Sequence, residues 1–273
     1  MRVRRSSRFF LTVIAIVVIL CTVFPLIWMG ISSFKTEAEI QRFPIQVFPD
    51  EWRLDNYEEL FEGGAFLRAL MMTMLGASIF SLGGIAINSM AAFAFARIDF
   101  RYRNFFWVYV IVTMFIPFMS IFVTSFIVVH GLGMVNTLSV LIVPALAAAV
   151  NVFFFRQFFL FFPLSLEEAA IIDGCSRFGV FVRIFLPNSI AIIVIVGIQR
   201  FMGYWNSYVW AVMTIRRQSL HTVMQALSYF RTQYGNDWGI IMAGSATAAI
   251  LPLVLLIAFQ RYIIQGVKIS GMK

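Results

Sequence analysis

Six apolar stretches, each long enough to cross a lipid bilayer, dominate this sequence. A bilayer core about 30 Å thick is crossed by roughly 20 helical residues. Hydrophobic residues make up 61% of the chain and charged residues 12%, whereas soluble domains carry about 25% charged residues. The sequence therefore excludes an ordinary soluble domain. It predicts an all-α integral membrane protein, a single domain over residues 1–273, with transmembrane helices at 9–31, 69–96, 105–129, 134–155, 190–212 and 239–259.

Helix-breaking residues lie inside several of these stretches. Proline and glycine are tolerated in membrane helices because neighbouring helices satisfy the freed backbone groups. We therefore expect interior, bent helices, with the second stretch broken at Gly83, Gly84 and Asn88. The prolines within other stretches are Pro25, Pro117, Pro144 and Pro252.

Basic residues are distributed unevenly between the connecting segments. Thirteen Lys and Arg residues flank one side of the six stretches, and six flank the other. Basic residues beside short loops stay cytoplasmic, so both termini are predicted to be cytoplasmic. The first stretch has no small-x-small cleavage pattern and is interpreted as an uncleaved span. Membrane topology thus accounts for the net charge of +8, and we expect no nucleic-acid partner.

Residues for catalysis, metal binding or ATP binding are scarce. The sequence has no Gly-x-x-x-x-Gly-Lys-Ser/Thr motif for a nucleotide phosphate. No carboxylate lies within a predicted span, although ion-coupled carriers place ionisable groups along their pathway. His130 and His221 are isolated, and Cys21 and Cys175 are too few for a disulfide framework. The chain is therefore predicted to be a transport component and not an enzyme, with no cofactor or metal of its own.

Acidic residues gather in one segment. Eight of the 13 carboxylates fall within residues 33–66, which carry a net charge of −5. A charge run of this kind is typical of a solvated loop. The alternative is a docking surface for an extracellular partner, and both interpretations stay open.

The segment 163–187, between the fourth and fifth stretches, predicts a helix-turn-helix outside the membrane. Its first residue is a proline, which discourages continuation of the preceding span. Ser165 and Glu168 form a capping-box pattern that starts a new helix. Gly174 can take the left-handed conformation that ends this helix, and Ser176 can cap a second one.

The first of these two helices has the composition of a protein-docking surface. It carries three acids and no base before Arg177, and Ala169 and Ala170 permit close approach. A helix that rests on lipid headgroups would favour Lys and Arg, because the cytoplasmic leaflet is anionic. A protein partner therefore fits this helix better than a lipid surface.

Seven positions at fixed spacing in this segment resemble the E-A-A signature of the permease subunits of ATP-binding-cassette importers. Nearly the whole chain resembles the maltose-type, six-span carbohydrate permeases, for example in Asn56-Tyr57 and Trp205-Asn206. The resemblance implies that the loop is a coupling helix that seats in a groove of an ATPase subunit. The residues predicted to couple to the ATPase are Glu168, Ala169, Ala170, Asp173, Gly174, Ile184, Leu186 and Pro187.

The resemblance also implies partners in a bacterial or archaeal cytoplasmic membrane. They are a second, homologous permease, two ATPase subunits that bind ATP and Mg²⁺, and an extracellular solute-binding protein. That protein would meet the acidic segment and the loop 214–238. A second, C-terminal ATPase contact is expected at Gln260, Arg261, Gln265 and Gly266.

The predicted function is the import of a sugar or oligosaccharide. A glycerol-phosphate-type or other polar organic solute is the alternative within the same importer class. From other classes, an exporter would not need the E-A-A spacing, and a channel would need a pore-lining charge ring that the sequence does not suggest.

The fifth stretch mixes aromatic and hydrogen-bonding side chains, as a site for a hydroxyl-rich sugar requires. Ordinary packing with an interfacial aromatic belt is the alternative. Arg200 argues against it, because an arginine near mid-span costs roughly 2.5 to 3.5 kcal/mol on insertion scales. We expect Arg200 to face a cavity, and to contact the substrate if that substrate is acidic. The asparagines of the path are also candidates for interhelical hydrogen bonds. The predicted path comprises Gln199, Arg200, Tyr204, Trp205, Asn206, Asn88 and Asn151.

Overall fold

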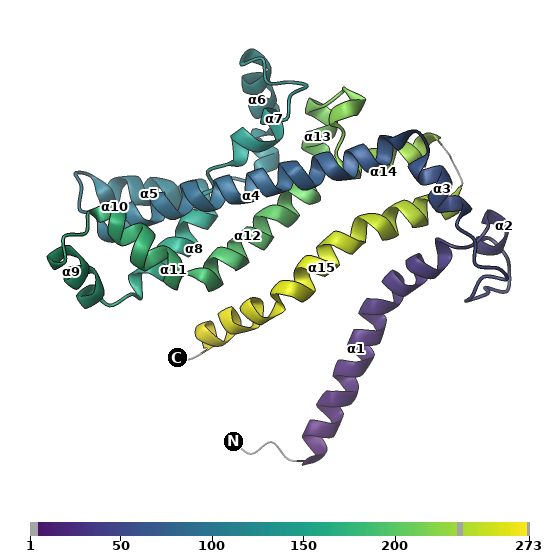
Figure 1. Cartoon of the computed structure of the whole chain (residues 1–273), viewed down its shortest axis with the longest axis horizontal. Helices are drawn as coiled ribbons and strands as arrows, with labels where there is room; N and C mark the ends of the chain where they lie inside the picture. The colour runs from purple at the N-terminus through teal and green to yellow at the C-terminus, as the bar shows by residue number, and fades with distance from the viewer. Residues whose placement is uncertain (1–4, 234–236, 272–273) are drawn as a thin grey trace. The chain divides into compact units, whose positions relative to one another are not determined.

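The structure is a computed structural model that describes residues 5–233 and 237–271, with side chains at 9–231 and 237–262. Every regular element in these ranges is helical (Figure 1). Three helices are long and apolar enough to cross a membrane, and three bent helix pairs pass the same test together, which gives three to six candidate spans. The chain separates into two compact units, Met1–Arg68 with Ala226–Pro252 (unit 1) and Ala69–Gln225 with Leu253–Lys273 (unit 2).

Unit 1 begins with a long apolar helix, α1. The most hydrophobic 18 residues of its apolar part, Phe9–Ser32, are not buried, and Pro25 lies inside the helix without ending it. A helix that is apolar all round and unburied requires a lipid or protein environment. Helix α1 spans Arg5–Ser32. Three short elements of this unit follow it, α2 (Glu37–Ile40), α3 (Asp55–Phe61) and η1 (Glu62–Gly64). The unit also includes the start of α4, most of α14 (Val223–Gln233) and the first part of α15 (Trp238–Gly271).

The polar segment after α1 is packed around a buried lysine. Lys35 donates from Nζ to the Gln46 carbonyl at 2.5 Å, and this ammonium lies 4.6 Å from the Trp28 ring centroid. Burial lowers the pKa of Lys35. Asn56 Nδ2 donates to the carbonyls of Ser33 and Lys35, both at 2.9 Å. The segment is therefore held by specific contacts at its base.

A capping box starts α2. Thr36 N donates to Glu39 Oε2 at 2.7 Å, and Glu39 N donates to Thr36 Oγ1 at 3.4 Å. The Asp50 N–H donates to Glu39 Oε1 at 2.6 Å. These hydrogen bonds, that from Asp50 foremost, lower the pKa of Glu39 because they favour its ionised form. Within the described part of this segment, the exposed acids without an ion pair are Glu51, Glu58, Glu59 and Glu62.

Unit 2 contains the longest run of packed helices, with α4 alongside α5, α8 and α12 (Figure 1). Its first elements are α4 (Ala65–Arg97), α5 (Arg103–Thr113), α6 (Phe118–Gly131), α7 (Ser139–Ile142), η2 (Val143–Ala145) and α8 (Ala149–Leu160). They are followed by α9 (Leu164–Ile172), α10 (Arg177–Val180), η3 (Phe181–Phe185), α11 (Leu186–Asn188), α12 (Ile190–Trp205), α13 (Val209–Thr214) and η4 (Gln218–Leu220).

Helix α4 runs without interruption through Gly83, Gly84 and Asn88, so the predicted break in the second span is wrong. The neighbours of Gly84 give the physical reason for a glycine there. A Cβ on Gly84 would lie 1.9 Å from Nε of Arg200, which is closer than any tolerable contact. The glycine makes room for a neighbouring side chain and does not break the helix.

The prolines have two different effects. Pro117 is the N-cap of α6 and Pro144 lies in η2, and the helices around them bend by 103° and 50°. The bends expected in the third and fourth stretches are therefore confirmed. Pro25 and Pro252 lie inside helices that continue past them, so no helix breaks there.

The fifth stretch is also interrupted, contrary to the prediction of one helix over 190–212. Helix α12 ends at Trp205, and α13 begins only at Val209. Asn206 is the C-cap of α12, and Ser207 N donates to the Tyr204 carbonyl at 3.0 Å in a tight turn. Asn and Ser favour caps and turns because their side chains compete with the helical backbone.

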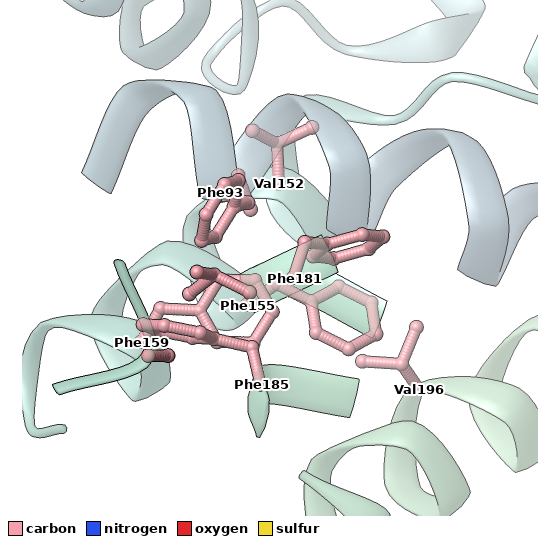
Figure 2. Close-up of a cluster of buried hydrophobic side chains, with 10 residues drawn as sticks. Phe93, Val152, Phe155, Phe159, Phe181, Phe185 and Val196 are labelled. Carbon is pink, nitrogen blue, oxygen red and sulfur yellow. The ribbon is translucent and has the colours of Figure 1, made fainter. Parts of the chain in front are cut away.

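Aromatic rings from three elements form a core in unit 2. Figure 2 shows Phe93 of α4, Phe155 and Phe159 of α8, and Phe181 and Phe185 of the π-helical turn η3 gathered in one buried cluster. The Phe185 ring centroid lies 5.0 Å from that of Phe93 and 5.3 Å from that of Phe159, in edge-to-face contacts. Such close packing holds the ends of α4, α8 and α10 in a fixed arrangement.

Candidate functional site

Helix α9 begins directly after Pro163, which is its N-cap, and ends at Ile172. No side chain caps its first turn, so the capping box predicted for Ser165 and Glu168 is wrong. With Pro163 as the N-cap, Ser165 is already the second residue of the helix. It therefore lies two residues beyond the N-cap position and cannot cap the free N–H groups of the first turn.

The C-terminal end of α9 follows the prediction. Gly174 has a φ of +82°, in the left-handed region. The Gly174 N–H donates to the Ile171 carbonyl at 3.0 Å, and the Cys175 N–H donates to the Ala170 carbonyl at 2.9 Å. This pair of bonds is a Schellman motif. Ser176 Oγ then accepts the N–H three residues further on at 3.1 Å and caps α10, also as predicted.

Helix α9 has one buried face and one exposed face. Glu167 and Ala170 are buried, whereas Glu168 and Ala169 are exposed. The exposed apolar side chains on and beside α9 are Leu164, Leu166, Ile171, Ile172 and Phe178. The outward surface therefore combines an acid with large apolar groups, an arrangement typical of a protein contact.

Glu167 links the buried face of α9 to α10 and α4 through ion pairs. Its carboxylate forms a hydrogen-bonded ion pair with the guanidinium of Arg177 at the start of α10. Its other oxygen lies 3.8 Å from Nε of Arg97 at the end of α4. Arg97 in turn donates from Nη2 to the carbonyls of Phe159 and Phe162, both at 2.6 Å. We call Glu167, Arg97 and Arg177 the α9 anchor.

Sequence reasoning missed the α9 anchor because it chose Glu168 and Asp173 as the coupling acids and passed over Glu167. The helical period contained a usable signal. Glu167 and Ala170 are three residues apart and share one face of α9, whereas Glu168 lies on another. The partner Arg97 has no local signal, because 70 residues separate it from Glu167 along the chain.

The remaining residues predicted for coupling lie around this anchor. Ile184 and Leu186 are half-buried against the aromatic core and do not face outward. Pro187 is exposed in α11, and Asp173 is the exposed C-cap of α9.

A second feature of unit 2 is a cavity of about 610 Å³. Four of the residues predicted for the substrate path, namely Gln199, Arg200, Tyr204 and Asn151, line this cavity. Further polar and aromatic lining comes from Ser125, Ser207, Phe80, Phe118 and Trp210, which the sequence did not single out as a group. Because they come from α4, α6, α13 and the turn after α12, only the tertiary fold brings them together.

Arg200 is 4% exposed and forms part of the cavity wall. Its Nη2 donates to the carbonyls of Ala145 at 3.1 Å and Leu146 at 3.0 Å. Its Nε donates to the Phe80 carbonyl at 3.3 Å, and its Cζ lies 4.1 Å from the Phe80 ring centroid. No carboxylate in the described part of the chain pairs with it. The expectation that Arg200 faces a cavity is thus met by its position.

The two asparagines of the predicted path differ. Asn88 Nδ2 donates to the carbonyls of Gly84 at 2.5 Å and Leu146 at 3.0 Å, and its Oδ1 accepts the Ala148 N–H at 2.8 Å. Its interpretation as an interhelical hydrogen bond is confirmed. The Oδ1 of Asn151 is buried without a hydrogen-bond partner among the described residues, so the same interpretation is wrong for Asn151.

Trp205 and Asn206 lie outside the cavity lining. Trp205 is buried and stacks on Phe201 with ring centroids 5.7 Å apart, so it belongs to the packing. Asn206 is exposed at the end of α12. Tyr204 does line the cavity, and a Cβ on Gly76 would lie 2.1 Å from its Oη, so a glycine of α4 again makes room for a cavity side chain.

The C-terminal positions predicted to contact an ATPase are described only in part. Gln260 and Arg261 are exposed on α15, and Arg261 Nη2 donates to Tyr262 Oη at 2.8 Å. The side chains of Gln265 and Gly266 lie outside the described residues. Over the ranges that the structure describes, no group of three His, Cys, Asp or Glu residues could hold a metal ion.

Comparison with known proteins assigns the chain to a family. Residues 84–269 match the binding-protein-dependent transport system inner membrane component. The arabinooligosaccharides transport system permease protein AraQ of Halalkalibacterium halodurans is 33% identical over 254 residues, covering 92% of this chain and 91% of that protein. The sulfoquinovosyl glycerol transport system permease protein SmoH of Agrobacterium fabrum is 28% identical over 252 residues, covering 92% of this chain and 88% of that protein.

A solved structure shares the fold. A crystal structure of a bacterial ABC transporter involved in the import of the acidic polysaccharide alginate contains a chain that superposes with a TM-score of 0.81 at 18% identity. The match covers 96% of this chain and 99% of that one. Family membership sets aside the exporter and channel alternatives and confirms the resemblance to importer permeases. The chain belongs to the inner membrane components of binding-protein-dependent transport systems, and is a non-catalytic, multi-pass permease subunit of an ABC importer.

Proposed function

We propose that the chain is one of two permease subunits in an ATP-driven importer of sugars or sugar-derived solutes. An extracellular solute-binding protein delivers the solute, and two separate ATPase subunits bind ATP and Mg²⁺. The relatives named for arabinooligosaccharide and sulfoquinovosyl glycerol transport support a carbohydrate cargo. The observation that carries the proposal is α9, which presents an exposed acidic and apolar face and is held from behind by the α9 anchor.

The membrane topology of the proposal is a single permease domain with six crossings. Three are the long helices, and one each is supplied by α5 with α6, by α7 with η2 and α8, and by α12. The excess of basic residues on one side supports cytoplasmic termini. In this topology α9 lies on the cytoplasmic side between the fourth and fifth crossings.

The ATPase contact is assigned to the outward face of α9. Ile172 is 84% exposed, and Leu166 and Phe178 are exposed beside it. Exposed apolar groups of this size mark contact sites on soluble surfaces, and Glu168 adds an acceptor for a basic residue of the partner. The C-terminal residues Gln260, Arg261, Gln265 and Gly266 form a second contact in this proposal.

The solute path is assigned to the 610 Å³ cavity. Its volume falls within the roughly 300 to 1,000 Å³ of small-molecule sites, and its aromatic walls with a few polar groups match their usual composition. On the outer side, the exposed acids of the segment after α1 and the loop 214–238 are assigned to the solute-binding protein.

A charge reversal at Glu168 tests the proposal. In the purified complex, Glu168→Lys replaces a charge-assisted contact worth about 1.5 to 3 kcal/mol with repulsion, so ATPase stimulation by the loaded binding protein should fall at least tenfold. Asp99→Lys is the matched control, because Asp99 is 96% exposed and lies between α4 and α5. Normal subunit stoichiometry together with normal stimulated ATPase activity in Glu168→Lys would contradict the coupling role of α9.

A further inference from the structure

We propose that the cavity of unit 2 binds the anionic group of the solute, so that the importer carries an acidic sugar such as a uronate, a sugar phosphate or a sulfonated sugar. The proposal rests on the proposed function and narrows its substrate class. Two groups on the cavity wall carry the argument, the guanidinium of Arg200 and the side-chain amide of Asn151.

The first group is a buried positive charge without a counter-charge. The described hydrogen bonds of Arg200 use Nε and Nη2, and all of them go to backbone carbonyls. Its other described contact is with the Phe80 ring, which carries no net charge. Carbonyls satisfy individual N–H donors but carry no net charge, so the cation stays uncompensated in surroundings where charge interactions are strong. No acid among the described residues lines the cavity. A solute anion supplies the missing charge.

The remaining donors of Arg200 are available to such an anion. A guanidinium has five N–H groups, two of them on Nη1. Nη1 has no hydrogen-bond partner in the described part of the chain, and it is not among the enclosed atoms that lack one. Because Arg200 forms part of the cavity wall, we assign these two N–H groups to the cavity. Paired N–H donors match carboxylate, phosphate and sulfonate oxygens.

The second group is an acceptor without a donor. Asn151 Oδ1 is enclosed and unpartnered among the described residues, and a buried acceptor of this kind calls for a hydroxyl or N–H group. Because Asn151 lines the cavity, rotation of its side chain brings Oδ1 within reach of a sugar hydroxyl there. Trp210, which donates from Nε1 to the Val140 carbonyl at 2.9 Å, and Phe118 add aromatic surface to the cavity wall for the apolar side of a pyranose.

The unmatched charge of Arg200 and the unpaired amide of Asn151 argue against a neutral sugar and against an inorganic anion as the ligand. A neutral sugar leaves the charge of Arg200 uncompensated. An inorganic anion leaves Asn151 unpaired and most of the 610 Å³ empty. One ligand that carries an anionic group, hydroxyl donors and an apolar ring face satisfies all three parts of the wall.

The first test measures the charge inside the cavity. Ser207 lines it, so Ser207→Cys, with Cys21 and Cys175 replaced by serine, reports on it in the complete transporter in nanodiscs. We compare its modification rates with an anionic sulfonatoethyl and a cationic trimethylammonium-ethyl methanethiosulfonate. The anionic-to-cationic rate ratio should fall by roughly tenfold in Arg200→Gln and be retained in Arg200→Lys. An unchanged ratio in Arg200→Gln, or no modification by either reagent, overturns the proposal.

The second test measures ligand class with the same reporter. Trigalacturonate should slow modification of Ser207→Cys in the presence of Arg200 and not in Arg200→Gln, whereas maltotriose should not slow it in either. Equal protection by maltotriose, no protection by trigalacturonate, or protection that persists in Arg200→Gln overturns the acidic-sugar assignment. Failure of the proposed function is seen separately, as absence of ATPase subunits from the wild-type complex.

Discussion

Two buried charged side chains of unit 2, Glu167 and Arg200, have opposite surroundings. Glu167 has two guanidinium partners, one of them Arg97, which is as deeply buried as Glu167. Among the described residues, Arg200 has only carbonyls and an aromatic ring. Removing one partner of a buried ion pair is costly because the other charge is left uncompensated. The charge of Glu167 is matched within the chain, although its Oε2 and Nε of Arg97 have no hydrogen-bond partner among the described residues, whereas the charge of Arg200 is unmatched and calls for a ligand.

Removing the acid of the α9 anchor should have the largest effect. Glu167→Leu leaves the buried Arg97 without its counter-charge, and we expect a loss of about 3 to 5 kcal/mol in the free energy of unfolding. Thermal melting of the detergent-solubilised complex measures this loss. Asp99→Leu, at an exposed ion pair, should stay within about 0.5 kcal/mol.

A double variant shows whether the orphaned charge causes that loss. Glu167→Leu combined with Arg97→Met removes both buried charges, so it should be less destabilised than Glu167→Leu alone. If the double variant loses the sum of the two single effects, the pairing explanation fails and packing of the leucine is responsible.

An intermediate effect is expected where α4 passes Arg200. Gly84→Ala places a Cβ 1.9 Å from Nε of Arg200 and must displace the guanidinium. We expect a loss of about 1 to 3 kcal/mol and slower solute uptake into proteoliposomes. Gly83→Ala is the control, because its Cβ would meet only the flexible end of Leu146 at 3.2 Å. Equal uptake by the two variants would show that the position of Arg200 is unimportant for transport.

The smallest effect is expected at the outer member of the α9 anchor. Arg177 is 57% exposed in its side chain, whereas Glu167 is buried. Water screens the pair on the Arg177 side, and Glu167 keeps Arg97 as a second cation nearby, so we expect a contribution of about 1 kcal/mol, at the upper end of the range for exposed pairs. Arg177→Gln should therefore lower the melting temperature only slightly, and the difference should shrink in high salt because exposed charges are screened. A loss as large as that of Glu167→Leu would mean that Arg177, and not Arg97, is the essential partner.

Local sequence signals predicted the fold well where the physics is local. Apolar runs located the three long apolar helices, Gly174 and Ser176 marked the turn after α9, and Pro117 and Pro144 marked bends. The capping box failed for a local reason as well, because Pro163 starts α9 before Ser165 can cap it.

The contacts that make the site were not predictable from one sequence. Gly84 was interpreted as a break because a glycine in an apolar run usually weakens a helix, and only the position of Arg200 explains it. Arg97 and Glu167 meet across separate helices, as do Trp210, Phe118 and Asn151 around the cavity. Arg200 was the one residue of the site whose surroundings could be predicted. A charged side chain in the middle of a span is costly in lipid, so it must face a cavity or a partner.

The unbroken course of α4 has a mechanical consequence. The same helix contacts Arg200 at Gly84 and ends at Arg97 in the α9 anchor, about 20 Å further along at 1.5 Å per residue. An unbroken helix cannot shorten without breaking its hydrogen bonds, so this part of α4 moves as a rigid body. A displacement of α9 along the α4 axis therefore moves the cavity wall by the same distance. The bent pair of α5 and α6 has a break at which such a displacement can be accommodated.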